Sequence, residues 1–229
     1  MRDSYPNESH VYRQARRELA NAEAALIEHV KEVARLRRTL PPGGKLKEDY
    51  LFTWATNERF GETVRFSELF RERSTLLLYS FMFGPNWDKP CPSCTSIVDG
   101  LDRMAPQVGK DAAIVVVGKA SALRIREWAE VRSWNQIDLV SGDGCNYQQD
   151  YCCQDSDDRQ FPKMNVFKKK GDEVLHFWGS EIATNDMDMF WPYWNLMDLT
   201  PEGRPNRPNP PQDFRSRYLE ENYSVKEDS

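Results

Sequence analysis

The chain has 229 residues, a length that suits one large domain or one domain with appendages. Hydrophobic residues make up 39% and aromatic residues 12%, so a sizeable core can form and a disordered protein is excluded over most of the length. A net charge of −5 argues against a nucleic-acid-binding protein with a basic surface. Because no run of about 18 apolar residues occurs and the first residues are polar, we expect a cytoplasmic protein without a membrane span or secretory signal.

One long helix is predicted from Val11 to Leu40. Apolar residues recur there at every third or fourth position, and Pro41-Pro42-Gly43-Gly44 ends the pattern. The resulting apolar stripe is expected to pack on the rest of the chain or on a second subunit. A membrane-surface helix is disfavoured because glutamates mix with arginines on the polar face. We assign residues 1–45 to this helical extension.

Strand and helix patterns then alternate along the chain. The predicted strands are a hairpin within Tyr50 to Phe70, the apolar runs Thr75 to Phe83 and Ala113 to Val117, a short strand from Ile137 to Val140, and a hairpin formed by Met164 to Lys168 and Glu173 to Trp178. Three helices are predicted. The first follows Cys94 and has Ile97, Val98, Leu101 and Met104 on one face; the second runs from Ser121 to Ser133, and the third from about Met187 to Met197.

This order of elements predicts an α/β protein with a thioredoxin-like fold. Two buried strands joined by a helix indicate a parallel sheet, and the last hairpin adds antiparallel strands at one edge. The long N-terminal helix and the C-terminal helix are additions to that core. We place the thioredoxin-like domain at residues 46–200 and expect the proline-rich residues 201–229 to form an extended, flexible tail.

Two of the five cysteines form the segment Cys91-Pro92-Ser93-Cys94, directly after a predicted buried strand and at the start of a helix. Open α/β sheets place their sites at this point. With Cys91 as N-cap, Pro92 takes the first helical position, and the free N–H groups of the helix favour a thiolate. We therefore predict that Cys91 is the exposed nucleophile with a lowered pKa and that Cys94 is the resolving thiol. Ser93 adds a hydroxyl near the sulfurs.

Zinc binding and a purely structural thiol pair are the alternatives for these two cysteines. A structural zinc site needs four ligands, and Cys145, Cys152 and Cys153 lack the spacing of a second knuckle. These three could form a relay disulfide, but we favour unpaired packing residues. His176 lies in a predicted strand and is expected to be a packed or edge residue. No metal and no cofactor are predicted.

The segment FMFGPNWDKPCPSC, which includes Trp87, resembles the thioredoxin-like proteins grouped as domain of unknown function 899, and so do YLFTWAT, ELFRERSTLLLYSFMF and MDLTPEGR. The resemblance covers about residues 12–204. It implies a dithiol–disulfide oxidoreductase with an unassigned substrate. The sequence departs from the family at Ala105-Pro106-Gln107, where a histidine-bearing segment is usual, and in its three additional cysteines. His176 matches a family histidine.

Pro162 precedes the closing hairpin, where thioredoxin-like folds carry a cis-proline that faces the cysteines. Such a proline leaves backbone groups free to pair with an extended substrate. Cis peptide bonds are largely confined to proline, but an ordinary trans proline at a strand start is also common. Both isomers therefore stay open at this position.

The sequence predicts a thiol–disulfide oxidoreductase. Its expected partners are a protein or small-molecule thiol or disulfide and a cellular thiol reductant, with a homodimer as a further option; nucleic acids and membranes are not expected partners. One alternative is a thiol peroxidase, in which peroxide oxidises Cys91 to a sulfenic acid that Cys94 resolves. The absence of a Thr-x-x-Cys motif at Cys91 counts against it. The other alternative is a non-catalytic binding or assembly protein.

Overall fold

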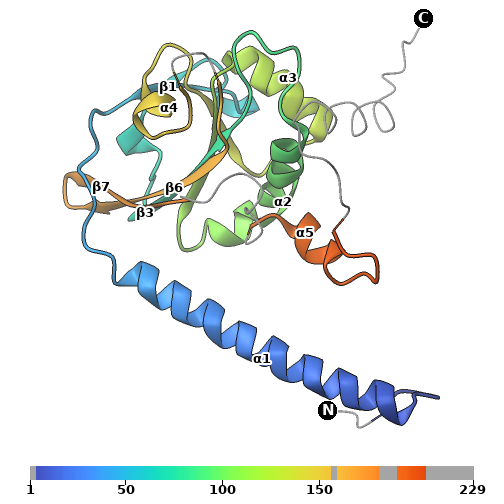
Figure 1. Ribbon diagram of the computed structural model, residues 1–229. Helices are drawn as coiled ribbons and strands as arrows, with labels where there is room; N and C mark the ends of the chain where they lie inside the picture. Colours follow the sequence, from blue (N-terminus) through green and yellow to red (C-terminus); the bar gives the residue numbers. More distant parts are fainter. Residues whose placement is uncertain (1–3, 156–158, 181–189, 205–229) are drawn as a thin grey trace, which may run out of the picture. The chain divides into compact units, whose positions relative to one another are not determined.

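The computed structural model describes residues 4–155, 159–180 and 190–204. The chain forms two compact units, Met1–Pro42 and Gly43–Ser229. Helix α1 (His10–Arg38) makes up most of the first unit, and the second contains the sheet and the other helices (Figure 1). None of the described helices combines the length and the apolar character needed to cross a lipid bilayer.

Helix α1 matches the predicted helix to within two residues at either end. The Ser9 hydroxyl accepts the backbone N–H of Tyr12 at 3.1 Å and caps the helix. Arginines occupy its last turn, where a positive charge stabilises the helix dipole. The helix buries none of its residues. The expectation that its apolar stripe packs on the domain or on a second subunit therefore stays a prediction.

The second unit is built on a seven-stranded sheet in the order β2-β1-β5-β4-β3-β6-β7. Strands β3, β4 and β5 are parallel, β6 and β7 form an antiparallel hairpin beside β3, and β1 and β2 form another beside β5. The strands are β1 (Leu51–Trp54), β2 (Thr63–Arg65), β3 (Thr75–Phe81), β4 (Ala113–Gly118), β5 (Asp138–Ser141), β6 (Lys163–Lys170) and β7 (Glu173–Gly179). The helices are α2 (Pro92–Val108), α3 (Ala122–Arg132), α4 (Tyr147–Asp150) and α5 (Pro192–Met197).

The centre of this sheet confirms the thioredoxin-like fold. Helix α2 connects the parallel strands β3 and β4, and the β6–β7 hairpin continues the sheet on the other side of β3. Every residue of β4 is buried, as expected for a parallel strand covered on both faces. The β1–β2 hairpin and β5 extend this core, and α1 belongs to the first unit.

Side chains of β3 alternate between two apolar cores. Tyr79 and Phe81 point into the core formed with α2 and α3, which includes Cys94 and Ile97. Leu76 and Leu78 point into the opposite core, which contains a cluster of aromatic rings from the β1–β2 hairpin and α4. Figure 1 shows α2 and α3 on one side of the sheet and α4 on the other. The strand that leads to the cysteine pair is therefore packed on both faces.

Several predicted boundaries are wrong by a few residues. Strand β3 ends at Phe81, two residues before its predicted end. The pattern Thr63-Val64-Arg65-Phe66 predicts the second strand of the first hairpin, but β2 ends at Arg65 and Phe66 begins a 3₁₀ turn. Helix α5 begins at Pro192, because proline lacks an N–H and suits the first helical position. The earlier part of that predicted helix, residues 187–189, and the predicted tail from residue 205 lie outside the described residues.

One predicted core position is also wrong. Met104 is 55% exposed, although the pattern places it on the buried face of α2. The buried stripe instead runs through Cys94, Ile97, Val98 and Ala105. Position around the helix does not explain this exposure, because Met104 lies seven residues, and only about 20° around the helix, from the buried Ile97.

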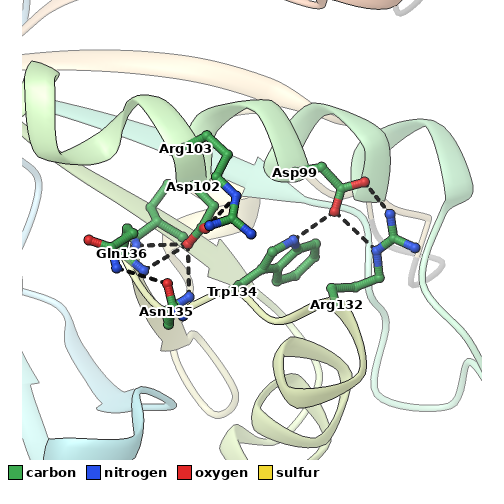
Figure 2. Close-up of polar contacts among 8 residues, drawn as sticks. Asp99, Asp102, Arg103, Arg132, Trp134, Asn135 and Gln136 are labelled. Carbon is green, nitrogen blue, oxygen red and sulfur yellow. Dashed lines mark hydrogen bonds and ion pairs between the residues drawn. The ribbon is translucent and has the colours of Figure 1, made fainter.

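The carboxylate of Asp102 ties α2 to the segment that leads into β5 (Figure 2). Asp102 is 1% exposed, and its Oδ1 accepts the backbone N–H groups of Asn135, Gln136 and Ile137 at 3.0, 2.8 and 3.1 Å. These hydrogen bonds give acceptors to the three backbone N–H groups that directly precede β5. One buried carboxylate thus fixes the side of α2 that faces β5.

Asp99, one turn earlier on α2, makes a second attachment. It accepts the indole N–H of Trp134 at 2.8 Å and forms a two-armed ion pair with the guanidinium of Arg132 (Figure 2). Paired arginine–carboxylate hydrogen bonds add directional specificity to the charge attraction. Asp99 and Asp102 together hold α2, and with it the cysteine pair at its start, against the α3–β5 connection.

Asp102→Ala should lower the free energy of unfolding by about 3 kcal/mol, because it removes the acceptor of three backbone N–H groups, of which that of Ile137 is buried, and an unsatisfied buried group costs about 1–3 kcal/mol. Urea unfolding followed by circular dichroism measures this change. Asp111→Ala removes an exposed carboxylate and should change stability by less than about 0.5 kcal/mol. Equal unfolding midpoints for the two variants would contradict the role assigned to Asp102.

Candidate active site

The cysteine pair lies at the carboxyl end of β3, at the first turn of α2. Cys91 is the N-cap and has an extended backbone (φ −61°, ψ 126°), and Pro92 follows at the first helical position. The backbone N–H of Cys91 donates to the Met82 carbonyl at 3.0 Å. Thr95 donates to the Cys91 carbonyl through both its N–H (2.9 Å) and its hydroxyl (3.0 Å). The position of Cys91 is thus fixed by its own main chain.

The two cysteines differ in their access to solvent. Cys91 is half-buried, whereas Cys94 is 1% exposed. Burial and the neighbouring Cys91 sulfur raise the pKa of Cys94 well above its ordinary value, and the Tyr79 hydroxyl and the Met82 backbone act in the opposite direction. Both cysteines are free thiols here. The arrangement gives one accessible sulfur in contact with one sulfur that water does not reach.

The sequence also singles out Pro92, Ser93 and Trp87 around this pair. Ser93 is half-buried between the cysteines, and Pro92 is buried. Trp87 is half-buried in the loop between β3 and α2. A Cβ atom at Gly84 would lie 2.8 Å from two atoms of the Trp87 indole, so the ring rests against the Gly84 backbone. Glycine at this position is therefore what allows the indole to approach the loop.

Arg124, which the sequence analysis does not single out, holds this loop in place. Its guanidinium donates to the carbonyls of Pro85, at 2.6 Å, and of Trp87, and it lies 4.7 Å from the centre of the Phe83 ring. A charged donor that binds two carbonyl groups of one loop restrains that loop. No local pattern could identify Arg124, because its partners lie nearly forty residues earlier in the chain.

Pro162 lies at the same edge of the sheet as the cysteines. It directly precedes Lys163, which pairs with Ser80 near the end of β3. Pro162 is half-buried. The described residues contain no cis peptide bond, so the bond before Pro162 is trans. The sequence leaves both isomers of this bond open, and the structure has the trans isomer.

Cys153 occupies the opposite face of β3 from the pair. The Ser80 hydroxyl donates to its sulfur at 3.0 Å, and the Asn165 amide lies 3.5 Å from the same sulfur. Burial raises the pKa of Cys153 to about 11. Cys145 is half-buried and Cys152 is exposed. Cys153 is thus a buried, hydrogen-bonded residue, in line with the packing role favoured for it.

His176 packs within the domain. Its Nε2 lies 3.0 Å from the Asn165 Oδ1, and its ring contacts Phe167 and Tyr151 with centroids 5.1 and 5.7 Å away. Over residues 4–155, 159–180 and 190–204, no group of three histidine, cysteine or acidic side chains is arranged to hold a metal ion. His176 is therefore a packed residue, as the sequence predicts.

Brief alkylation of the reduced protein with iodoacetamide at pH 7 should label Cys91 and the exposed Cys152, but not Cys94. The reagent needs an accessible thiolate, whereas Cys94 is buried and its raised pKa favours the protonated thiol. Peptide mass mapping measures the label at each site, and the equally buried Cys153 serves as the matched control. Labelling of Cys94 as fast as Cys91 would contradict the assigned difference in access.

Comparisons with known proteins place the chain in a family. Among solved structures it is similar to thioredoxin peroxidase I of Plasmodium yoelii (15% identity, TM-score 0.47, 63% of this chain and 80% of that chain). It is also similar to the exposed lipoprotein thioredoxin of Streptococcus pneumoniae (17% identity, TM-score 0.40, 56% of this chain and 87% of that chain). A third similar structure is peroxidoxin BcpB of Mycobacterium tuberculosis (17% identity, TM-score 0.44, 63% of this chain and 88% of that chain). No curated protein sequence matches the chain. Residues 1–222 match the family described as bacterial protein of unknown function (DUF899), and the chain belongs to that family.

Proposed function

We propose that the protein is a thiol–disulfide oxidoreductase that uses Cys91 and Cys94 as its dithiol. The observation that carries the proposal is the pairing of an accessible sulfur with a buried one at the start of α2. A dithiol of this kind exchanges electrons with a second thiol or disulfide without a bound cofactor. The expected substrates are protein or small-molecule disulfides, and the expected reductant is a cellular thiol.

In the first step the Cys91 thiolate attacks one sulfur of the substrate disulfide. A bond forms between the Cys91 Sγ and that sulfur, the substrate S–S bond breaks, and the other substrate sulfur leaves with the electron pair and takes a proton. The free N–H groups at the start of α2 stabilise negative charge on the attacking sulfur. The half-buried position of Cys91 gives the substrate access to it.

In the second step Cys94 loses its proton and attacks the Cys91 Sγ. The Cys91–Cys94 bond forms and the bond from Cys91 to the substrate breaks, so the second substrate sulfur leaves as a thiol. The substrate has gained two electrons and the protein has lost two, which a thiol reductant restores. Because Cys94 is buried, a substrate cannot be captured by it in place of Cys91.

A redox titration in glutathione buffers, with mass spectrometry of the bond formed, tests the proposal. We expect a reversible Cys91–Cys94 disulfide with a potential between roughly −270 and −120 mV, the range of known dithiol oxidoreductases. With hydroxyethyl disulfide as substrate, Cys94→Ser should accumulate a stable mixed disulfide between Cys91 and one hydroxyethanethiol, while the other half of the substrate leaves as 2-mercaptoethanol. Cys91→Ser should abolish both reactions, whereas Cys152→Ser, which removes an exposed cysteine elsewhere, should leave both unchanged.

Peroxide reduction is the competing outcome of the same experiments. A thiol peroxidase would use the same two cysteines, with peroxide oxidising Cys91 to a sulfenic acid before Cys94 closes the disulfide. Consumption of hydrogen peroxide in a coupled assay with dithiothreitol, without exchange against hydroxyethyl disulfide, would replace the proposed activity with that one. Failure of the Cys91–Cys94 disulfide to form with either oxidant would overturn both and favour a binding or assembly protein.

A further inference from the structure

Tyr79 places a phenol directly behind the cysteine pair. It lies on β3, on the face that packs against α2, and it belongs to the same buried core as Cys94. Its side chain is 0% exposed. The hydroxyl interacts with the Cys94 sulfur and, more weakly, with the Cys91 sulfur. Tyr79 is thus the residue of β3 that reaches the sulfurs from inside the domain.

The Tyr79 hydroxyl has no completed hydrogen bond among the described residues. It lies next to the Cys94 Sγ, but the two atoms do not meet the geometry of a formed hydrogen bond. A buried polar group without a partner costs free energy, and tyrosine hydroxyls in protein cores usually find one. A neutral thiol is a weak acceptor, whereas a thiolate at the same place is a strong one.

The protonation of Tyr79 suits it to donate. Burial raises the pKa of its phenol well above the ordinary value, and the nearby sulfurs act in the same direction. The phenol therefore keeps its proton at any pH at which the cysteines react. The groups that act most strongly on the Cys94 sulfur are Cys91, the Tyr79 hydroxyl and the Met82 backbone. Tyr79 is the side chain in that set that remains a donor throughout the reaction.

We propose that the Tyr79 hydroxyl is the hydrogen-bond donor that stabilises the Cys94 thiolate when Cys94 resolves the mixed disulfide on Cys91. The inference rests on the proposed dithiol function and adds a residue to it. The Cys94 thiol gives up its proton, which balances the one that the departing substrate sulfur takes, and the anion accepts the phenol O–H. The Cys94 Sγ then bonds to the Cys91 Sγ, the departing substrate sulfur takes the electron pair and a proton, and the phenol is left unchanged.

The magnitude of the effect follows from two opposing terms. Loss of a hydrogen bond to a charged group should raise the pKa of Cys94 by about one unit or more. One unit lowers the thiolate fraction about tenfold below that pKa. The more basic thiolate is also about threefold more nucleophilic, given a Brønsted coefficient of about 0.4–0.5. The resolving step should therefore slow about threefold while its pH profile moves to higher pH.

Tyr79→Phe removes the hydroxyl alone and tests the inference. Stopped-flow reaction of the reduced full chain with Ellman's reagent, in a Cys145→Ser/Cys152→Ser background, separates attack by Cys91 from release of the second chromophore by Cys94. We expect the second phase to slow about threefold between pH 6 and 8 and its apparent pKa to rise by about one unit. The first phase should stay unchanged.

Tyr147→Phe is the matched control, because Tyr147 is a fully buried tyrosine in the core on the other face of the sheet. It should leave both phases as in the parent protein. Tyr79→Leu also lacks the hydroxyl and should show the same shift of the second phase, which separates the donor from ring packing. Urea unfolding verifies that each variant is folded.

The outcomes separate this inference from the proposed function. If the parent protein releases one chromophore and stops at a stable mixed disulfide, the dithiol function itself fails. If the parent protein shows both phases and Tyr79→Phe reproduces its rates and pH profile, the dithiol function stands and the inference on Tyr79 is overturned. A Tyr147→Phe variant with the same shift as Tyr79→Phe would also overturn it.

Discussion

Burial of β3 on both faces is the constraint on which the rest of the domain depends. Its odd-numbered side chains enter the core under α2 and its even-numbered ones enter the aromatic core on the other face, so neither face can tolerate a shift of register. The end of this strand fixes the position of Cys91, whose N–H donates to the Met82 carbonyl one residue beyond β3. The chemistry of the site therefore starts from a strand that has no freedom to move.

The different roles of the two cysteines follow from helix geometry. Cys91 is the N-cap, where the chain has not yet turned into the helix, and Cys94 lies one turn further along on the face that packs against β3. The same helix therefore leaves one sulfur accessible and buries the other. Because Asp99 and Asp102 hold α2 against the α3–β5 connection, the helix cannot rotate to exchange these environments.

The sequence predicts the fold well because its strongest signals are local. Two apolar runs of strand length and the CPSC segment are visible without any knowledge of distant contacts, and they place the cysteine pair correctly at the end of β3. Tyr79, Arg124 and Asp102 are not visible in this way. A tyrosine inside TLLLYSF is typical of any core, and charged residues on helices are typical of a surface. Their roles arise from partners that lie far away in the chain, which periodicity and spacing do not record.

The segment that precedes α5 completes the surroundings of the pair. The Trp191 indole donates to the Ser96 hydroxyl of α2 at 3.1 Å, and the Phe190 ring meets Tyr79 edge-on with centroids 6.1 Å apart. These contacts cover Tyr79 and α2 with apolar surface. A dry environment strengthens a hydrogen bond and also makes an unpaired anion more costly. The same packing that buries Cys94 and raises its pKa therefore makes a donor beside it more important than it would be at the surface.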